Sequence, residues 1–213
     1  MVAGRDTIAV ALSWFFWLVT TNPGVEEKIL EELDRVVITQ TVGESGEEQG
    51  IFSSIEELNK MVYLHGAISE TLRLYPSVPN EPKQSMEADV LPSGHAVGKN
   101  TRILVSIYSM GRMEEVWGKD WMEFKPERWI SERTEGNNII NDAYKFAAFL
   151  AGPRSCPGRK IAFMQLKNIA SCVLRRYKIV VVDDHPVLPL PSIMMFMKYG
   201  LKVRVLSRKP ENK

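Results

Sequence analysis

The sequence predicts a mainly α-helical fold with small β-sheets (α+β), built as one globular domain of 213 residues. Helical apolar spacing occupies most of the first 76 residues and returns after Gly158. Between these regions, and again at the end of the chain, Pro, Gly and short β-prone runs alternate, which is typical of small sheets. The 45% hydrophobic content is enough for one substantial core.

Charge and cysteine usage narrow the function classes. The chain has 27 basic and 26 acidic residues, whereas a nucleic-acid-binding protein usually carries a basic excess, so no nucleic-acid partner is expected. Two cysteines, Cys156 and Cys172, are too few for a disulfide scaffold. The three histidines are scattered and show no zinc-site spacing.

The first predicted helix covers residues 6–21. Its apolar run, Ile8 to Val19, is shorter than the roughly 20 residues that span a bilayer. Asp6 stands where a signal peptide carries positive charge, so we expect a buried helix and neither a signal peptide nor a transmembrane segment. Asn22 then caps a second predicted helix over 22–38, with Pro23 in its first turn.

A polar, Gly-rich stretch over 39–52 predicts an exposed loop. Ser54 and Glu57 form a capping box at the start of the next helical pattern, which breaks near Lys60 and ends before Pro76. Residues 82–141 predict short β segments, including Asp89–Leu91 and Thr101–Ile107, and a long irregular stretch.

The last part of the chain predicts one helix and several strands. The helix follows Gly158 and places four side chains near one face: Ile161, Gln165, Ile169 and Val173. The expected strands are 179–182, 193–197 and 201–205. The last two flank Lys198-Tyr199-Gly200, a predicted hairpin turn.

The strongest chemical signal is the run from Phe149 to Gly158, FLAGPRSCPG. It places Cys156 in a glycine-rich loop just before a helix, where the helix N-terminus and nearby cations stabilise a thiolate. Such a cysteine suits metal ligation or nucleophilic chemistry. A buried structural role is the commoner explanation of any single cysteine, and a nucleophilic hydrolase would need a partnering histidine motif, which we do not find.

This run matches the cytochrome P450 signature Phe-x-x-Gly-x-Arg-x-Cys-x-Gly at every defined position. Three further segments resemble P450 motifs in the family's order: Ala3-Gly4-Arg5-Asp6-Thr7 of the I helix, Glu70-x-x-Arg73 of the K helix, and Phe124-Lys-Pro-Glu-Arg128-Trp129. The chain therefore resembles the C-terminal portion of the P450 fold, from the middle of the I helix to the final β hairpin.

The resemblance assigns each segment a place in that fold. The expected segments are the I-helix remainder (1–21), the J helix (22–38), the J′ and K helices (54–76), β segments and meander (82–141), the Cys-ligand loop (149–158), the L helix (159–176) and the C-terminal strands (177–207).

The resemblance also implies the roles of the site residues. Cys156 ligates the iron of haem b, and further haem contacts are expected from Phe149, Gly152, Arg154, Gly158 and Lys83. Asp6 and Thr7 deliver protons to bound dioxygen; a plain helix cap is the alternative for this pair. Glu70, Arg73 and Arg128 form a buried network behind the cysteine loop; for Glu70 and Arg73 the alternative is a surface ion pair.

The partners follow from the same resemblance. Electrons come from NADPH through NADPH-cytochrome P450 reductase, and O₂ is the co-substrate. A basic group of Arg159, Lys160 and Lys167 is expected to dock the reductase. The full-length family lies at the cytosolic face of the endoplasmic reticulum membrane, and we expect no anchor in this chain.

The strings SETLRLYPSVP, SIYSMGRM, VWGKD and MKYGLKV resemble a plant branch that hydroxylates long-chain fatty acids and alkanes. The substrate-facing residues are then Ala3, Val78, Pro79, Ile193 and Met194. Two departures stand out: Leu150 replaces a small or polar residue, and the chain is less than half a full P450. A truncated, non-catalytic remnant that lacks the N-terminal half of the haem pocket is therefore the alternative function.

Overall fold

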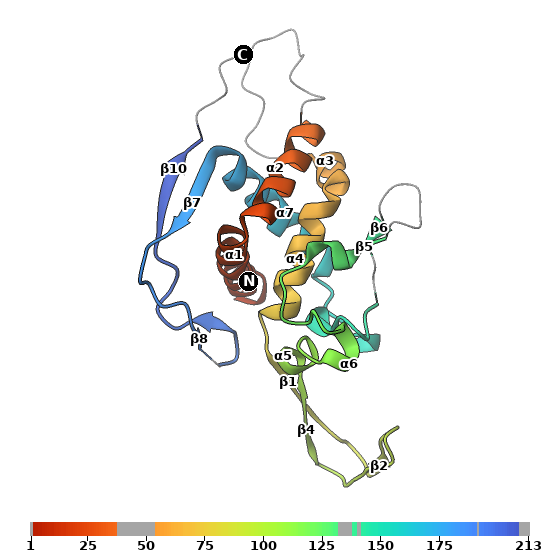
Figure 1. The fold of residues 1–213 in the computed structure, drawn as a ribbon. Coiled ribbons are helices and arrows are strands. Elements are labelled where there is room, and N and C mark those ends of the chain that lie inside the picture. The colour runs from red at the N-terminus through yellow and green to blue at the C-terminus, as the bar shows by residue number, and fades with distance from the viewer. Residues whose placement is uncertain (1, 38–53, 132–137, 140–141, 191, 209–213) are drawn as a thin grey trace.

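The computed structural model describes residues 2–37, 54–131, 138–139, 142–190 and 192–208. The predicted loop over 39–52 lies outside these ranges. Within them, the long helices α1 (Val2–Thr21), α2 (Pro23–Val37), α4 (Val62–Leu74) and α7 (Arg159–Arg176) form the body (Figure 1). The described strands pair as small two-stranded antiparallel sheets. The prediction of a mainly α fold with small sheets is thus confirmed.

The junction of α1 and α2 turns the chain sharply at Asn22. Its backbone carbonyl accepts hydrogen bonds from the amides of Val25 and Glu26, which begins α2. Its side chain points the other way, because Nδ2 donates to the Leu18 carbonyl at 2.7 Å. Asn22 therefore takes the predicted position at the start of α2, but its side chain satisfies an orphan carbonyl at the end of α1.

None of the described helices could by itself span a membrane on length and apolar content. The pair Ala3–Thr21 and Pro23–Val36 meets that test only when taken together, and it is bent by 108°.

The predicted capping box forms as expected. The Ser54 hydroxyl accepts from the Glu57 amide at 3.2 Å, and the Glu57 carboxylate accepts from the Ser54 amide at 2.6 Å. These bonds start α3 (Ile55–Lys60), which ends at the predicted break. At the start of α4, two more amides are satisfied by the Glu32 carboxylate from α2, those of Tyr63 and Leu64.

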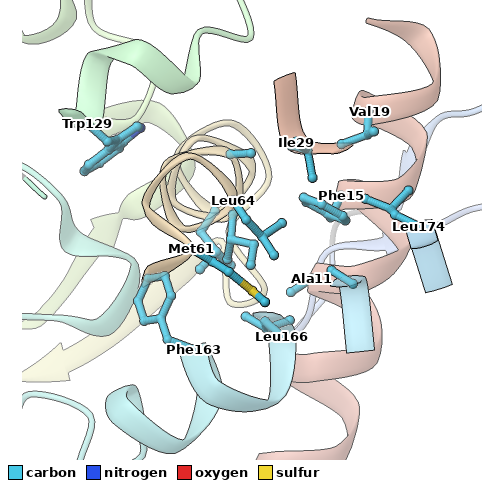
Figure 2. Close-up of a cluster of buried hydrophobic side chains, with 14 of the residues drawn as sticks. Ala11, Phe15, Val19, Ile29, Met61, Leu64, Trp129, Phe163, Leu166 and Leu174 are labelled. Atoms are coloured by element: carbon cyan, nitrogen blue, oxygen red, sulfur yellow. The ribbon is translucent and has the colours of Figure 1, made fainter. Parts of the chain in front are cut away.

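The main core lies where α1, α2, α4 and α7 meet, as Figure 2 shows. Each helix contributes an apolar stripe, and burial of one such side chain stabilises the fold by about 1.5–3 kcal/mol. The side chains at the centre include Phe15 and Val19 of α1, Ile29 and Leu33 of α2, Leu64 and Ile68 of α4, and Leu166 and Leu174 of α7.

The buried face of α7 is not the one on which the sequence groups Ile161, Gln165, Ile169 and Val173. Ile161 and Ile169 are exposed, and the buried side chains follow the spacing of Phe163, Leu166, Ala170 and Leu174. Lys167 is buried on the same face, because its ammonium donates to the Leu58 carbonyl at the end of α3. A charged residue can line a core when its head group finds such a partner and its stem packs on apolar side chains.

The C-terminal strands pair differently from the predicted hairpin. β9 (Phe196–Met197) pairs with β8 (Pro189–Leu190), whereas β10 (Val203–Ser207) pairs over five residues with β7 (Tyr177–Val181). A second buried cluster explains the split: Met195 and Met197 pack against Trp14 of α1, whose indole N–H donates to the Met195 carbonyl. This contact holds the 193–197 segment on α1, and β10 continues to β7.

The segment between α4 and α7 begins with a β ribbon that projects from the body (Figure 1). In the ribbon, β1 (Asn80–Gln84) pairs with β4 (Arg102–Ser106), and β2 (Asp89–Val90) pairs with β3 (Ala96–Val97). The remaining short elements are α5 (Ile107–Met110), α6 (Glu114–Trp117), η2 (Pro126–Trp129), β5 (Ile130–Ser131), β6 (Asn138–Ile139), η3 (Ala147–Phe149) and η4 (Gly152–Arg154).

Candidate functional site

The cysteine loop joins η3 and η4 to the start of α7. The Cys156 amide donates to the Phe149 carbonyl at 2.8 Å, which folds the loop back on itself. Gly152 has φ +72°, a conformation that glycine adopts without strain. Gly158 has φ −81°, and a Cβ there would lie 3.7 Å from the Cys156 sulfur, an ordinary contact. The loop therefore leaves Cys156 as an exposed free thiol.

A cavity of about 270 Å³ opens between this loop, α1, α4, α7 and the segment that leads into β1. The thiol lies in its wall, and most of the other lining side chains are apolar. Among the residues expected to form the site, the cavity brings together Ala3, Thr7, Val78, Phe149, Arg154 and Cys156.

Other expected site residues lie outside the lining of this cavity. The Asp6 carboxylate pairs with Arg5 at 2.7 Å. Thr7, the next residue, does line the cavity, and its hydroxyl donates to the Ala3 carbonyl of its own helix at 2.5 Å. Asp6 is inside α1, so the alternative of an N-terminal helix cap does not apply. The Lys83 ammonium pairs with Glu81 at 2.5 Å.

The expected substrate-facing residues are divided. Ala3 and Val78 line the cavity, and Pro79 is the residue after Val78. Ile193 is 87% exposed and does not line the cavity. Met194 is partly buried against the Trp14 cluster, so its side chain packs with the second core.

Several cavity residues were not expected from the sequence. Glu81 of β1 is one of the lining residues. Residues two apart in a strand share a face, so the position of Glu81 two residues before Lys83, an expected haem contact, is a signal that could have found it. The other lining residues that were not expected lie on helices or in loops: Ile8, Ala11, Leu72, Ser77, Ile107, Ala148, Leu150, Ala162 and Leu166. Ala11 continues the four-residue spacing of Ala3 and Thr7 along α1.

Behind the loop, the Glu70 carboxylate of α4 accepts hydrogen bonds from several groups. The Arg73 guanidinium binds it through Nε at 2.8 Å and Nη2 at 2.7 Å, and both side chains are fully buried. Arg128 Nε lies at 3.2 Å and the Trp129 indole nitrogen at 2.8 Å. The surface-pair alternative for Glu70 and Arg73 is therefore excluded.

Arg73 also holds the irregular segment that follows α5. Its two terminal nitrogens donate to three backbone carbonyls: Gly111 at 2.5 Å, Trp121 at 2.8 Å and Glu123 at 3.0 Å. Gly111 approaches so closely that a Cβ there would lie 2.1 Å from the Arg73 carbonyl oxygen. The arginine thus fixes a stretch of chain that has no regular ladder of its own.

An aromatic chain connects this network to the cysteine loop. The Trp129 ring lies edge-on to Phe146 at 4.6 Å between centroids, and Phe146 lies edge-on to Phe149 at 6.3 Å. The Phe149 backbone carbonyl also accepts a hydrogen bond from the Cys156 amide. The Glu70 network is therefore connected to the cysteine loop by packed aromatic rings and one backbone hydrogen bond.

Charges near the site have shifted pKa values. The pKa of Asp120 is lowered to about 2, chiefly by hydrogen bonds from Lys125 and Arg128. Burial lowers the pKa of His65 to about 3, and the charges of Lys167 and Arg159 lower it further. The His65 ring stacks on Phe163 at 4.1 Å, so the imidazole packs as a neutral aromatic group.

The three residues of the predicted basic group on α7 differ in their exposure to solvent. Lys160 is exposed, and the Arg159 guanidinium lies 5.7 Å from the Phe149 ring centre. Lys167 is buried, with its ammonium on the Leu58 carbonyl, so the prediction that it belongs to a docking surface is wrong.

Comparison with known proteins identifies the family. The sequence model of the family described as "Cytochrome P450" matches residues 1–205. The chain is 46% identical over 211 residues to cytochrome P450 86B1 of Arabidopsis thaliana, a match that covers 98% of this chain and 37% of that protein. It is 43% identical over 208 residues to alkane hydroxylase MAH1 of the same plant, covering 98% of this chain and 38% of that protein.

A third relative has a different printed function. Noroxomaritidine synthase 2 of Narcissus aff. pseudonarcissus MK-2014 is 41% identical over 210 residues, covering 98% of this chain and 40% of that protein. The chain thus spans about two fifths or less of the length of these three relatives. Its match to the family model runs over nearly the whole of its own length, and the chain belongs to the cytochrome P450 family.

Proposed function

We propose that this chain forms the thiolate-bearing portion of a cytochrome P450 monooxygenase that hydroxylates long-chain fatty acids or alkanes. Its co-substrates are O₂ and electrons from NADPH, delivered by NADPH-cytochrome P450 reductase, and it works at the cytosolic face of the endoplasmic reticulum membrane. The observation that carries this proposal is the apolar cavity in which the Cys156 thiol, Arg154 and Thr7 meet.

The donor set of this cavity fits haem b. Within the described residues there is no cluster of three or more His, Cys, Asp or Glu that could hold a bare metal ion, whereas a porphyrin supplies four nitrogens of its own and needs one protein thiolate. Cys156 would provide that thiolate, and Arg154 a cation for a propionate. Haem bound through a cysteine thiolate supplies oxygen activation and favours O–O cleavage.

The protein side chains supply position and protons. Phe149 packs in the wall beside the thiol, and the Glu70 network holds the loop from behind. Thr7 lines the cavity, and its hydroxyl can pass a proton inward when it leaves the Ala3 carbonyl. Asp6, the preceding residue of α1, would feed that hydroxyl through its carboxylate, which is paired with Arg5. Lys83 can take a second propionate if it exchanges its partner Glu81.

The substrate class rests on the lining and on the name of one relative. Ala3 and Val78 are small and apolar, which suits an aliphatic chain. The name of one relative, alkane hydroxylase, states this type of substrate. Pro79, Ile193 and Met194 complete the proposed substrate contacts.

A truncated, non-catalytic remnant is the second candidate. The chain spans 37–38% of the length of the two Arabidopsis relatives named above, and turnover distinguishes this candidate from the first.

Turnover separates the two candidates. The chain is loaded with haem and mixed with purified reductase, NADPH, and either a long-chain fatty acid or an alkane. Formation of hydroxylated product that disappears in Cys156→Ala supports the monooxygenase. Stoichiometric haem binding without product, in the presence of active reductase, supports the remnant.

A further inference from the structure

Leu150 has a backbone conformation that side chains rarely adopt. Its φ is 58° and its ψ is 177°, a region of the map that is populated almost exclusively by glycine. A residue with a Cβ stays in such a region only where its surroundings determine the conformation. Leu150 lies between η3 and η4, six residues before Cys156.

The peptide group on the N-terminal side of Leu150 is held at both polar atoms. Its N–H, from Leu150, donates to the Ala147 carbonyl at 2.9 Å. Its carbonyl, from Phe149, accepts the Cys156 amide at 2.8 Å. Rotation about φ of Leu150 moves this peptide relative to the rest of the loop, so this one dihedral angle determines whether the Phe149 carbonyl faces the cysteine.

The side chain of Leu150 is seated in the cavity wall. It is partly buried and lines the same space as Cys156, together with Ile107 of α5 and Leu166 of α7. Apolar burial favours keeping the side chain there, and it adds to the two backbone hydrogen bonds that hold the adjoining peptide.

We propose that Leu150 is a positioning residue for Cys156. Its side chain, seated in the cavity, holds the backbone in the glycine-like conformation that keeps the Phe149 carbonyl on the Cys156 amide. The inference deepens the proposed function, because it assigns a residue that orients the thiol toward the cavity.

Two substitutions at this position have opposite consequences. Leu150→Ala removes the anchoring side chain but keeps the Cβ, so the strained conformation loses its support. Leu150→Gly also removes the side chain, but it makes the conformation accessible without strain. A role in filling volume predicts the reverse order, because glycine leaves the larger void.

Amide hydrogen exchange shows which of the two substitutions loosens the loop more. It is measured on the chain labelled with ¹⁵N-cysteine and without added haem. The labelled chain gives two signals, because its sequence has two cysteines. The Cys172 amide, inside α7, is the internal reference. Asn100→Gly is the control, since Asn100 has φ 63° and does not line the cavity.

The expected result is a Cys156 amide that exchanges slowly in the parent chain, in Leu150→Gly and in Asn100→Gly, and many-fold faster in Leu150→Ala. Exchange at Cys172 stays the same in all four proteins. Equal rates at Cys156 in Leu150→Ala and Leu150→Gly, faster exchange in Leu150→Gly, or a fast Cys156 amide in the parent chain would each overturn the inference.

A second readout uses haem and is kept separate from the first. Leu150→Gly should retain the parent's fraction of thiolate-type haem absorbance, and Leu150→Ala should lose most of it. If the parent chain itself shows no thiolate-type absorbance, the proposed function fails, while the exchange experiment still decides the role of Leu150 in the loop.

Discussion

The indole nitrogen of Trp129 lies 2.8 Å from the Oε2 atom of Glu70, and both side chains are buried. Through this bond, a residue of the η2 turn contributes to the network that Glu70 forms with Arg73 and Arg128. The Trp129 ring also packs on Phe146, which in turn packs on Phe149 at the start of the cysteine loop. Stability of the network and orientation of the loop are therefore expected to change together.

Glu70→Gln should strongly destabilise the chain. It leaves the Arg73 guanidinium buried without a counter-charge, and breaking a buried pair in this way costs about 3–5 kcal/mol. Urea unfolding followed by tryptophan fluorescence measures the loss. Lys28→Ala is the control, because it breaks an exposed pair with Glu127 and should change the free energy of unfolding by less than about 1 kcal/mol. Equal effects of the two substitutions would refute a special role for the network.

Trp129→Phe should cost about 2 kcal/mol, because a hydrogen bond to a charged group is lost while most of the ring packing stays. The same unfolding experiment, extended to the double variant Glu70→Gln/Trp129→Phe, tests the reason. If the indole acts through Glu70, the double variant is more stable than the sum of the single losses predicts. Simple addition would mean that Trp129 contributes by packing alone.

Gly111→Ala should destabilise the chain by at least about 1–3 kcal/mol, because the new Cβ would lie 2.1 Å from the Arg73 carbonyl oxygen and the backbone must move. Gly24→Ala is the matched control in α2, where a Cβ meets nothing within 4 Å. It should be neutral or stabilising by up to about 1 kcal/mol. Thermal unfolding of the two variants compares them, and a tolerated Gly111→Ala would show that this close approach is not rigid.

His65 should make stability depend on pH in the acid range. Burial lowers its pKa to about 3 from an ordinary value of 6.5, so the unfolded chain binds a proton between these values and the folded chain does not. The contribution of His65 is fully present above pH 6.5. It is lost as the pH falls toward 3, with a slope of at most about 1.4 kcal/mol per pH unit.

His65→Phe keeps a ring against Phe163 and removes the titrating group. The free energy of unfolding of this variant, measured by urea at several pH values from 4 to 8, should fall less steeply with acid than that of the parent chain. Parallel pH profiles for the two proteins would contradict a proton-free His65 in the folded state.

Local signals predicted much of the fold. Ser54 and Glu57 form the expected capping box, the helix break near Lys60 occurs, and α4 ends at Leu74 before Pro76. These features depend on hydrogen bonds within a few residues, so local sequence is enough to specify them.

The features that were mispredicted depend on distant partners. Lys167 is buried because the Leu58 carbonyl, more than a hundred residues earlier, receives its ammonium. The 193–197 segment leaves its expected hairpin because Trp14 of α1 binds it. No local pattern encodes either contact, since packing between elements can override local preference.

The candidate site was predicted in the same uneven way. Motifs located Thr7, Phe149, Arg154 and Cys156, and the structure brings these four into one cavity. Glu81 was missed, and Lys83 lies in a pair with it.

The central claim is that the Cys156 thiolate holds haem in this cavity, and the reduced, CO-bound absorbance spectrum tests it most directly. The parent chain, Cys156→Ala and Cys172→Ala are each reconstituted with haem, reduced and exposed to CO. We expect a red-shifted, thiolate-type Soret band in the parent chain and in Cys172→Ala, and no such band in Cys156→Ala. A thiolate-type band that survives in Cys156→Ala, or that is absent from the parent chain, would contradict it.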